Sequence, residues 1–244
     1  MLVKQKVKYI QSLGQKKFRE QEGLFIAEGP KIVKELLEAG TANIKELYAV
    51  KEWIIENKEL LDKTEVFEIT GIELEKISQL TTPNKVVAVV KQFNPEEKII
   101  TKGKITLALD AIQDPGNLGT IIRIADWFGV EQIVCSNGCA EVYNPKVVQA
   151  TMGSIARVKI IYTDLPTWVS QQKGITIYAA MLEGKDVTKM NPVKEGLIII
   201  GNEAKGIQEE LLQFVNEKIT ISKKGKAESL NAAVATGIIL SHIV

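Results

Sequence analysis

Short runs of apolar residues alternate with helical patterns along the whole chain. In the N-terminal part, strand-like runs lie at residues 24–29, 44–50, 66–70 and 86–93. After a polar stretch that contains Pro95 and Gly103, such runs resume at 105–110, 132–136, 157–161, 176–181, 197–201 and 218–222. These later runs are nearly continuous Ile, Val and Leu, which is typical of strands buried on both faces of a parallel sheet.

This rhythm predicts an α/β protein of two domains. We place a smaller α/β domain at residues 1–93, a linker at 94–104 and a parallel-sheet domain at 105–244. Pro30 and Gly40 mark the start and end of one predicted helix. Further helices are expected from about residue 117, near 145–151, near 165–172 and from Ser229 to the end.

Composition adds one local feature to this picture. The 244 residues carry a net charge of +1, with 25% charged and 45% hydrophobic residues, as in ordinary soluble proteins. The first 19 residues are basic, with no acidic residue before Glu20. Their charges are those of Lys4, Lys6, Lys8, Lys16, Lys17 and Arg19. Such a segment suits contact with phosphate groups, and a solvated helix face is the alternative.

Potential metal ligands and export signals are scarce. Cys135, Cys139 and His242 are the only cysteines and histidine, which is too few for a metal cluster. Cys135 lies in an apolar run and is read as a core residue. The count allows a Cys135–Cys139 disulfide, although nothing indicates secretion. No apolar leader or membrane-spanning run is present, so we expect a reduced cytoplasmic protein without metal or membrane.

Three segments have the form of a strand that runs into a glycine-rich polar loop. They are DAIQDPGNLGTIIR (110–123), LIIIGNEAKGI (197–207) and the region 219–240. In parallel sheets, sites gather at the carboxyl ends of strands, where glycines let a ligand approach the backbone. None of the segments is GxGxxG or GxxxxGK[ST], so a dinucleotide site or a P-loop has no motif here.

Together these segments resemble the three signature motifs of the SpoU/TrmH family of RNA ribose methyltransferases, within the SPOUT superfamily. The matching patterns are Asn117-x-Gly119-x-x-x-Arg123, Gly201-Asn202-Glu203-x-x-Gly206 and Ser229-Leu230-Asn231. The likeness covers about residues 105–244, and residues 16–37 resemble the family's substrate-binding domain, which is akin to RNA-binding ribosomal proteins.

The resemblance implies a deep trefoil knot in the C-terminal domain, bound S-adenosylmethionine, and a homodimer whose active sites are completed across the interface. It assigns the cofactor to Ala180, Met181, Ile200, Gly201, Asn202, Gly206, Ile221 and Leu230. It assigns catalysis to Arg123, Asn117, Glu203, Ser229 and Asn231. The candidate RNA-binding residues are Lys16, Lys17, Arg19, Lys223, Lys224 and Lys226.

Arg123 is the residue that the resemblance makes central. Methyl transfer to a ribose 2′-hydroxyl needs an aligned oxygen and an acceptor for its proton. A guanidinium stays protonated at neutral pH, so we expect Arg123 to grip the phosphate and the 2′-oxygen rather than to act as a base. The alternative is a purely structural ion pair, because this arginine sits in an apolar helix.

Other motif residues also have structural alternatives. Asn117 and Ser229 are both suited to cap the helices that begin near them, in addition to facing a ligand. Glu203 is either a solvated loop charge or a contact of the substrate or Arg123. The lysines of the 223–226 loop fit RNA contact and plain surface charge equally well. Trp127 is expected to pack in the core or in the dimer contact.

Two stretches depart from the family pattern. The chain has Ile221-Ser222-Lys223-Lys224-Gly225 where relatives usually have Ile-Pro-Met before the glycine, so the resemblance does not predict the conformation of the cofactor loop. It has Ala232-Ala233-Val234 where Val-Ser-Val is common, which is a conservative change on a helix.

The predicted function is methyl transfer from S-adenosylmethionine to a ribose of RNA, with 23S rRNA favoured over tRNA because of the N-terminal domain. The main alternative is a non-catalytic RNA- or ribosome-binding protein that retains the knot. A Rossmann-type methyltransferase is a third reading, and its glycine-rich first loop is missing.

Overall fold

The computed structural model describes residues 2–62, 64–93 and 99–244. By their contacts these residues form two compact units, which are described one by one. The first contains the described residues up to Phe93 together with Glu141–Arg157. The second contains the remaining described residues up to Ala140 and Val158–Val244. Residues 94–98 of the expected linker lie outside the described residues, and residues 99–104 form no helix or strand.

The first unit is built on a four-stranded mixed sheet in the order β1-β4-β2-β3. Its strands are β1 (Leu24–Glu28), β2 (Ile44–Ala49), β3 (Val66–Glu68) and β4 (Val86–Lys91). Its helices are α1 (Lys4–Ser12), α2 (Lys16–Glu22), α3 (Pro30–Ala39), α4 (Lys51–Glu56), η1 (Lys58–Leu60), α5 (Gly71–Ile77), α7 (Pro145–Thr151) and η2 (Ser154–Ala156). The predicted helix boundaries at Pro30 and Gly40 are confirmed, since Pro30 opens α3 and Gly40 ends it in the left-handed conformation.

The segment Glu141–Arg157 packs with the N-terminal residues although it follows β6 in the chain. The ring of Tyr143 lies 4.9 Å from that of Phe25, and the Tyr143 hydroxyl accepts a hydrogen bond from the backbone N–H of Phe93. Arg157 donates to the Glu35 carboxylate at 2.8 Å. A segment from the middle of the sequence therefore completes the core of the first unit.

The second unit contains a six-stranded sheet in the order β10-β8-β9-β5-β6-β7, with every neighbouring pair parallel. Its strands are β5 (Ile105–Leu109), β6 (Gln132–Ser136), β7 (Lys159–Thr163), β8 (Ile177–Asp186), β9 (Gly196–Ile200) and β10 (Glu217–Thr220). The predicted α/β parallel sheet is confirmed, and β6 and β9 are buried along their whole length. The trefoil knot stays a prediction.

β8 is longer than the predicted run 176–181. It pairs with β10 at Ala179, skips five residues, and pairs again where Lys185 meets Ile219. The residues from Leu182 to Lys185 are exposed, and three of the four residues 183–186 are charged, so the apolar pattern ended too early. Gly184 is required at this second contact, because a Cβ there would lie 2.5 Å from the Lys218 carbonyl oxygen.

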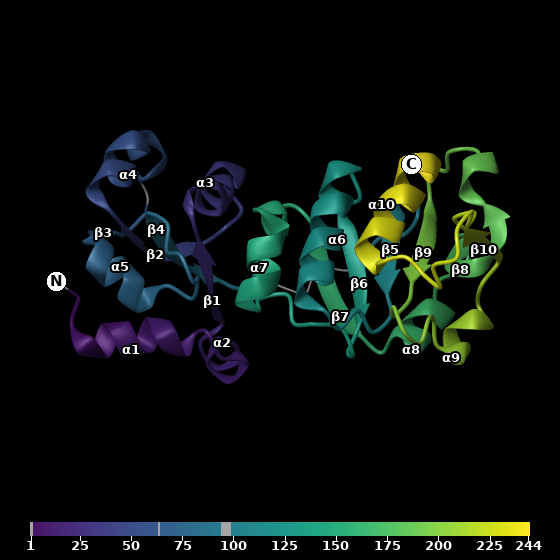
Figure 1. Cartoon of the computed structure of the whole chain (residues 1–244), viewed down its shortest axis with the longest axis horizontal. Coiled ribbons are helices and arrows are strands. Elements are labelled where there is room, and N and C mark those ends of the chain that lie inside the picture. Colours follow the sequence, from purple (N-terminus) through teal and green to yellow (C-terminus); the bar gives the residue numbers. More distant parts are fainter. Residues whose placement is uncertain (1, 63, 94–98) are drawn as a thin grey trace. The chain divides into compact units, whose positions relative to one another are not determined.

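Helices flank this sheet. They are α6 (Pro115–Trp127), α8 (Leu165–Ser170), η3 (Val187–Lys189), α9 (Glu209–Leu212) and α10 (Ala232–Ile243). α6 packs against α10, and α8 packs against α9; the first pair lies side by side in Figure 1. Among the described residues, no helix is both long and apolar enough to cross a membrane.

Candidate active site

The residues predicted to bind the cofactor gather at the carboxyl edge of β10, β8 and β9, which are neighbours in the sheet. Ala180 and Met181 lie in the skipped segment of β8, while Ile200 ends β9 and Ile221 follows β10. Ala180, Met181 and Ile221 are half-buried, and Leu230 is 46% exposed. Apolar side chains that the chain itself leaves partly uncovered suit the adenine ring and the methylene groups of a methionine chain, so these residues fit S-adenosylmethionine.

One hydrogen-bonded chain connects all three motif segments. The Asn117 amide donates from Nδ2 to the carboxylate of Glu203. The Asn231 amide donates from Nδ2 to Asn117 Oδ1 at 2.8 Å. Asn117 comes from α6, Glu203 from the loop after β9, and Asn231 from the start of α10. Three polar side chains far apart in the sequence are therefore held at one place, and Glu203 is not simply a solvated loop charge.

The helix caps differ from those expected at Asn117 and Ser229. Asp114 caps α6 by accepting from the Asn117 backbone N–H at 2.7 Å, and Asn117 itself lies inside the first turn. Asn231 caps α10 through its Oδ1, so Ser229 stands outside the helix. The prediction that the closing helix begins at Ser229 is wrong because the asparagine, not the serine, meets the free N–H groups.

Arg123 is exposed on α6, and within the described part of the chain its guanidinium has no ion pair or hydrogen bond. Thr120, Arg123 and Trp127 share the exposed side of this helix, and Trp127 is 83% exposed. A structural ion pair within the chain therefore does not explain Arg123. Trp127 is not a core residue either, because most of its surface is open.

The loop after β9 holds its own shape. Gly201 lies so close to the returning chain that a Cβ would be 2.5 Å from the carbonyl carbon of Gly206. Asn202 and Gly206 exchange two backbone hydrogen bonds, of 3.0 and 2.9 Å. The Asn202 side chain donates to the Ala111 carbonyl oxygen and accepts from the Ala204 and Lys205 N–H groups. The polar groups of Asn202 and the backbone of Gly206 therefore stabilise the conformation of this loop.

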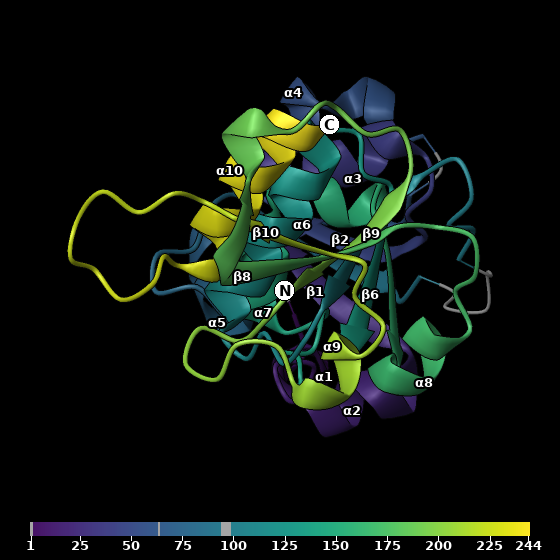
Figure 2. The ribbon, with the colours of Figure 1, turned by 90° about the vertical axis from the view of Figure 1, so that its right-hand side faces the viewer.

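The third-motif loop is held at its two ends, by Ser222 after β10 and by Asn231 before α10. The Ser222 hydroxyl donates to the Asp186 carboxylate, which also accepts from the backbone N–H and hydroxyl of Thr188. These hydrogen bonds, led by that of Ser222, lower the pKa of Asp186 to about 2. Beyond this point the loop is exposed, and Figure 2 shows the segment between β10 and α10 reaching out from the sheet. Lys223, Lys224 and Lys226 have no partner among the described residues.

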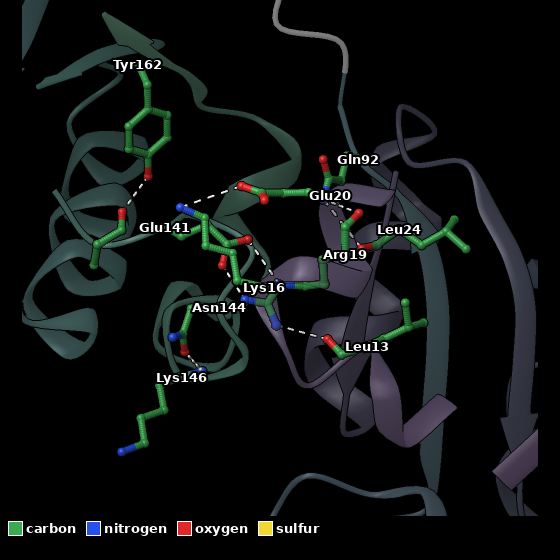
Figure 3. Close-up of polar contacts among 11 residues, drawn as sticks. Leu13, Lys16, Arg19, Glu20, Leu24, Gln92, Glu141, Asn144, Lys146 and Tyr162 are labelled. Atoms are coloured by element: carbon green, nitrogen blue, oxygen red, sulfur yellow. Dashed lines mark hydrogen bonds and ion pairs between the residues drawn. The ribbon is translucent and has the colours of Figure 1, made fainter. Parts of the chain in front are cut away.

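The basic N-terminal segment contains one residue that must be reassigned. Arg19 is only 2% exposed, and its guanidinium binds both oxygens of the Glu141 carboxylate and the Leu13 carbonyl (Figure 3). It is therefore a structural residue that is not open to RNA. Lys16 is exposed with its ammonium 3.6 Å from Glu20, and Lys17 is exposed.

Both cysteines are free. Cys135 is fully buried, as expected for a core residue. Cys139 accepts from the Ile112 N–H at 3.3 Å and lies 3.2 Å from the Leu109 carbonyl oxygen, which ties the turn after β6 to β5. No group of three metal-ligating side chains is found in the part of the chain that the structure describes.

Comparison with known proteins gives the family. The profile of the SpoU rRNA Methylase family matches residues 104–241, and that of the MRM3-like substrate binding domain matches residues 4–88. The chain belongs to the SpoU rRNA methylase family. The expected enzyme class, an RNA methyltransferase that uses S-adenosylmethionine, is confirmed with it.

Similar proteins share both parts of the chain. The 23S rRNA (guanosine(2553)-2'-O)-methyltransferase RlmP of Bacillus subtilis is 33% identical over 98% of this chain and 96% of its own. An AdoMet-bound rRNA methyltransferase structure from Sinorhizobium meliloti is 32% identical, with a TM-score of 0.86 over 99% and 95% of the two chains. The AdoMet complex of AviRb from Streptomyces viridochromogenes is 25% identical, with a TM-score of 0.84 over 97% and 96%.

Asp186 and Asp114 were missed by the sequence interpretation. Asp114 precedes Pro115, and an Asp-Pro pair is a known signal for a helix start. Asp186 precedes Val187 and Thr188, a pattern in which an aspartate bonds the backbone two residues on. Both signals are present in the sequence, and both concern the loops that build the site.

Proposed function

We propose that this chain transfers a methyl group from S-adenosylmethionine to a ribose 2′-hydroxyl of the large-subunit ribosomal RNA. The observation that carries the proposal is the hydrogen-bonded chain of Asn117, Glu203 and Asn231, together with the partly uncovered apolar residues of β8 and after β10. The names of the relatives support rRNA over tRNA. The Bacillus enzyme is named for a guanosine of 23S rRNA, and a Streptomyces relative, 26% identical, for a uridine. The nucleotide itself is therefore not carried over.

In this proposal the bound cofactor would supply an electrophilic methyl group, and the residues of the chain hold the cofactor. The side chains of Ala180, Met181, Ile221 and Leu230 contact its apolar parts, and Ile200 and Gly201 adjoin it through their backbone. Asn202 and Gly206 act on it through the shape of the loop, because their polar groups are paired with one another and with Ala111. Binding therefore depends on a loop that is formed before the cofactor arrives.

Arg123 is proposed to bind the phosphate beside the target ribose and the 2′-oxygen. Its fixed charge and forked N–H groups stabilise negative charge that develops on the oxygen, while the proton leaves to the phosphate or to water. Glu203 accepts a hydrogen bond from the Asn117 amide, so it orients the asparagine pair toward the substrate. Ser229, which is exposed and outside the helix, is left to contact the RNA.

The chain is further proposed to act as a cytoplasmic homodimer through α6 and α10. Trp127 is 83% and Val234 51% exposed, and both lie on these two adjacent helices. Large apolar groups that gather on one surface are typical of an interface. Arg123 lies on the same exposed side of α6 as Trp127, so dimer formation would bring this arginine to the partner's site.

The domain that begins the chain is proposed to bind the RNA, with residues 1–93 as its main part and 105–244 as the catalytic part. Lys4, Lys8, Lys16 and Lys17 are exposed there, which suits phosphate contact. The lysines of the 223–226 loop would add a second basic surface.

A direct test is to incubate the purified protein with labelled S-adenosylmethionine and an in vitro transcript of large-subunit rRNA. The proposal expects stoichiometric label at one ribose, detected as a position that resists alkaline cleavage. Saturable cofactor binding without any transfer, to naked rRNA or to ribosomal particles, would favour the non-catalytic RNA-binding protein instead.

A further inference from the structure

A cavity of about 370 Å³ opens at the carboxyl edge of the six-stranded sheet, beside the loop that follows β9. Four segments line it: the residues that follow β5 and β6, the turn between β7 and α8, and the loop between β9 and α9. All four belong to the second unit. The volume is at the lower end of the range for small-molecule sites, so one small planar ligand fits it better than a long chain.

The order of the strands makes this place a natural binding site. From β5 the chain first builds β6 and β7 on one side, and it then crosses to the other side to build β8 and β9. The sheet order therefore reverses between β5 and β9. In open parallel sheets, ligands bind in the crevice outside the carboxyl ends at such a reversal. Two cofactor residues, Asn202 and Gly206, also line the cavity, but their polar groups are paired with one another and with Ala111. The apolar cofactor residues lie at the ends of β8, β9 and β10 or in the loop before α10, which leaves the crevice between β5 and β9 for a second ligand.

The cavity is one residue away from the hydrogen-bonded chain of the motifs. Asn202 lines the cavity, while the next residue, Glu203, is bonded to Asn117. Neighbouring Cα atoms are about 3.8 Å apart, so a single loop separates the two places. An RNA strand whose target ribose lies at Glu203 and Asn117 therefore has its neighbouring nucleotide within reach of the cavity.

The charges of the lining exclude a phosphate and favour a donor of hydrogen bonds. The carboxylates of Asp110, Asp164 and Glu210 face a single ammonium, that of Lys205. Asp110 is already engaged by the backbone and side-chain N–H groups of Gln208, each at 2.8 Å. Asp164 caps α8 by accepting from the Thr167 N–H at 3.0 Å.

Two lining side chains remain available to a ligand. Glu210 and Asn137 are exposed, and neither bonds another side chain in the described part of the structure. A carboxylate only accepts hydrogen bonds, whereas an amide both donates and accepts them. Leu165 and Pro166 add an apolar surface against which a ring can lie. This combination matches the edge and face of a nucleobase that carries an exocyclic amino group.

We propose that the cavity is a subsite for an amino-bearing nucleobase of the RNA, next to the nucleotide that is methylated. The inference rests on the proposed function, because it needs an RNA strand at the motif residues. Glu210 accepts a hydrogen bond from the amino group of the base, and Asn137 contacts a neighbouring position of the same edge. The subsite contributes to the choice of the RNA sequence.

The first experiment compares Asn137→Ala and Glu210→Gln with the wild-type protein on an in vitro transcript of large-subunit rRNA. We expect KM for the RNA to rise about tenfold or more, the scale of losing a good contact to a base edge. The single-turnover rate at saturating RNA and the affinity for S-adenosylmethionine should stay within twofold. Glu209→Gln is the matched control, because it removes the same charge from the same turn of α9 outside the cavity. If both cavity variants behave like this control, the subsite does not exist.

A second experiment does not depend on catalysis. The side-chain amide signal of Asn137 is followed by NMR during titration with guanosine, inosine, cytidine and uridine. Guanosine and cytidine should shift it at lower concentrations than inosine and uridine, which lack the amino group. If RNA is not methylated but this difference is seen, the proposed function fails and the subsite stands. If the four nucleosides behave alike, the subsite proposal fails whatever the RNA assay shows.

Discussion

Substitution by alanine is predicted to affect two arginines of this chain differently: at Arg123 it should lower activity, and at Arg19 it should lower stability. Arg123 is exposed and has no partner among the described residues, so Arg123→Ala should change the free energy of unfolding by no more than about 0.5 kcal/mol. Cofactor affinity should also hold, because the cofactor residues lie in other segments. Turnover should fall about 100-fold or more, since one preorganised donor to the developing charge is worth about 2.7 kcal/mol. Arg123→Lys keeps the charge but loses the planar fork, so it should restore little activity.

Arg19→Ala is the contrasting variant. Its guanidinium is 2% exposed and holds both oxygens of Glu141, which is itself mostly buried. Removing one partner of such a pair leaves a carboxylate without compensation and should cost about 3–5 kcal/mol of stability. Activity should then decline only with the folded fraction.

The assay is the same for the wild type and these three variants: melting temperature, calorimetric affinity for S-adenosylmethionine, and single-turnover methyl transfer below each protein's transition. The reasoning is refuted if folded Arg123→Ala keeps full activity. It is refuted equally if Arg123→Ala lowers the melting temperature as Arg19→Ala does and Lys restores it, because that is the pattern of a structural charge.

Three further predictions follow from the loops and the helices of the second unit. Trp127→Glu should convert the proposed homodimer to a monomer in sedimentation at micromolar concentration. Ile55→Glu, at a comparably exposed apolar position of the first unit, should leave the proposed dimer intact. A Trp127 variant that stays dimeric would exclude Trp127 from the interface. Gly201→Ala should lower stability by about 1–3 kcal/mol and weaken cofactor binding, because the new Cβ meets backbone atoms at 2.5–2.6 Å that cannot move independently. Gly225→Ala is the control, because nothing lies within 4 Å of its Cβ position. Equal effects of the two substitutions would contradict the argument. Ser222→Ala should raise the pKa of Asp186 from about 2 toward its ordinary value, as measured by NMR titration, and weaken cofactor binding. Ser222→Thr should keep the low pKa and the cofactor affinity. Because the Asp186 pKa is depressed, its stabilising effect is present above the unfolded pKa and is lost only as pH falls through about 2. An unchanged Asp186 pKa in Ser222→Ala would show that the serine does not hold it.

The sheet of the second unit could be predicted from the sequence because its strands are buried on both faces. Runs such as LIIIG and QIVCS carry that burial in their composition, and the motif loops follow them directly. The second half of β8 was not predicted because most of LEGKD is not apolar, and only its pairing with β10 makes it a strand. The cavity could not be found at all before the strand order was known.

Contacts between distant residues account for the other differences. Arg19 stands in a basic segment, and its partner Glu141 is 122 residues away, so the sequence indicated a surface charge where the structure has a buried pair. Gly201 was expected to make room for the cofactor. In the structure it makes room for the backbone of Gly206 and Ile207, which lie at 2.5–2.6 Å from its Cβ position. The asparagine pair Asn117–Asn231, 114 residues apart, was predicted as two separate site residues and not as one hydrogen-bonded unit.

The measurement that tests the central claim most directly is a map of ribose methylation in total RNA, from cells with and without the gene and from cells that carry Arg123→Ala. The account predicts one 2′-O-methylated position in large-subunit rRNA that disappears without the gene, returns with the wild-type gene, and does not return with the arginine variant. Identical maps in all strains, or a lost position that lies in tRNA, would contradict it.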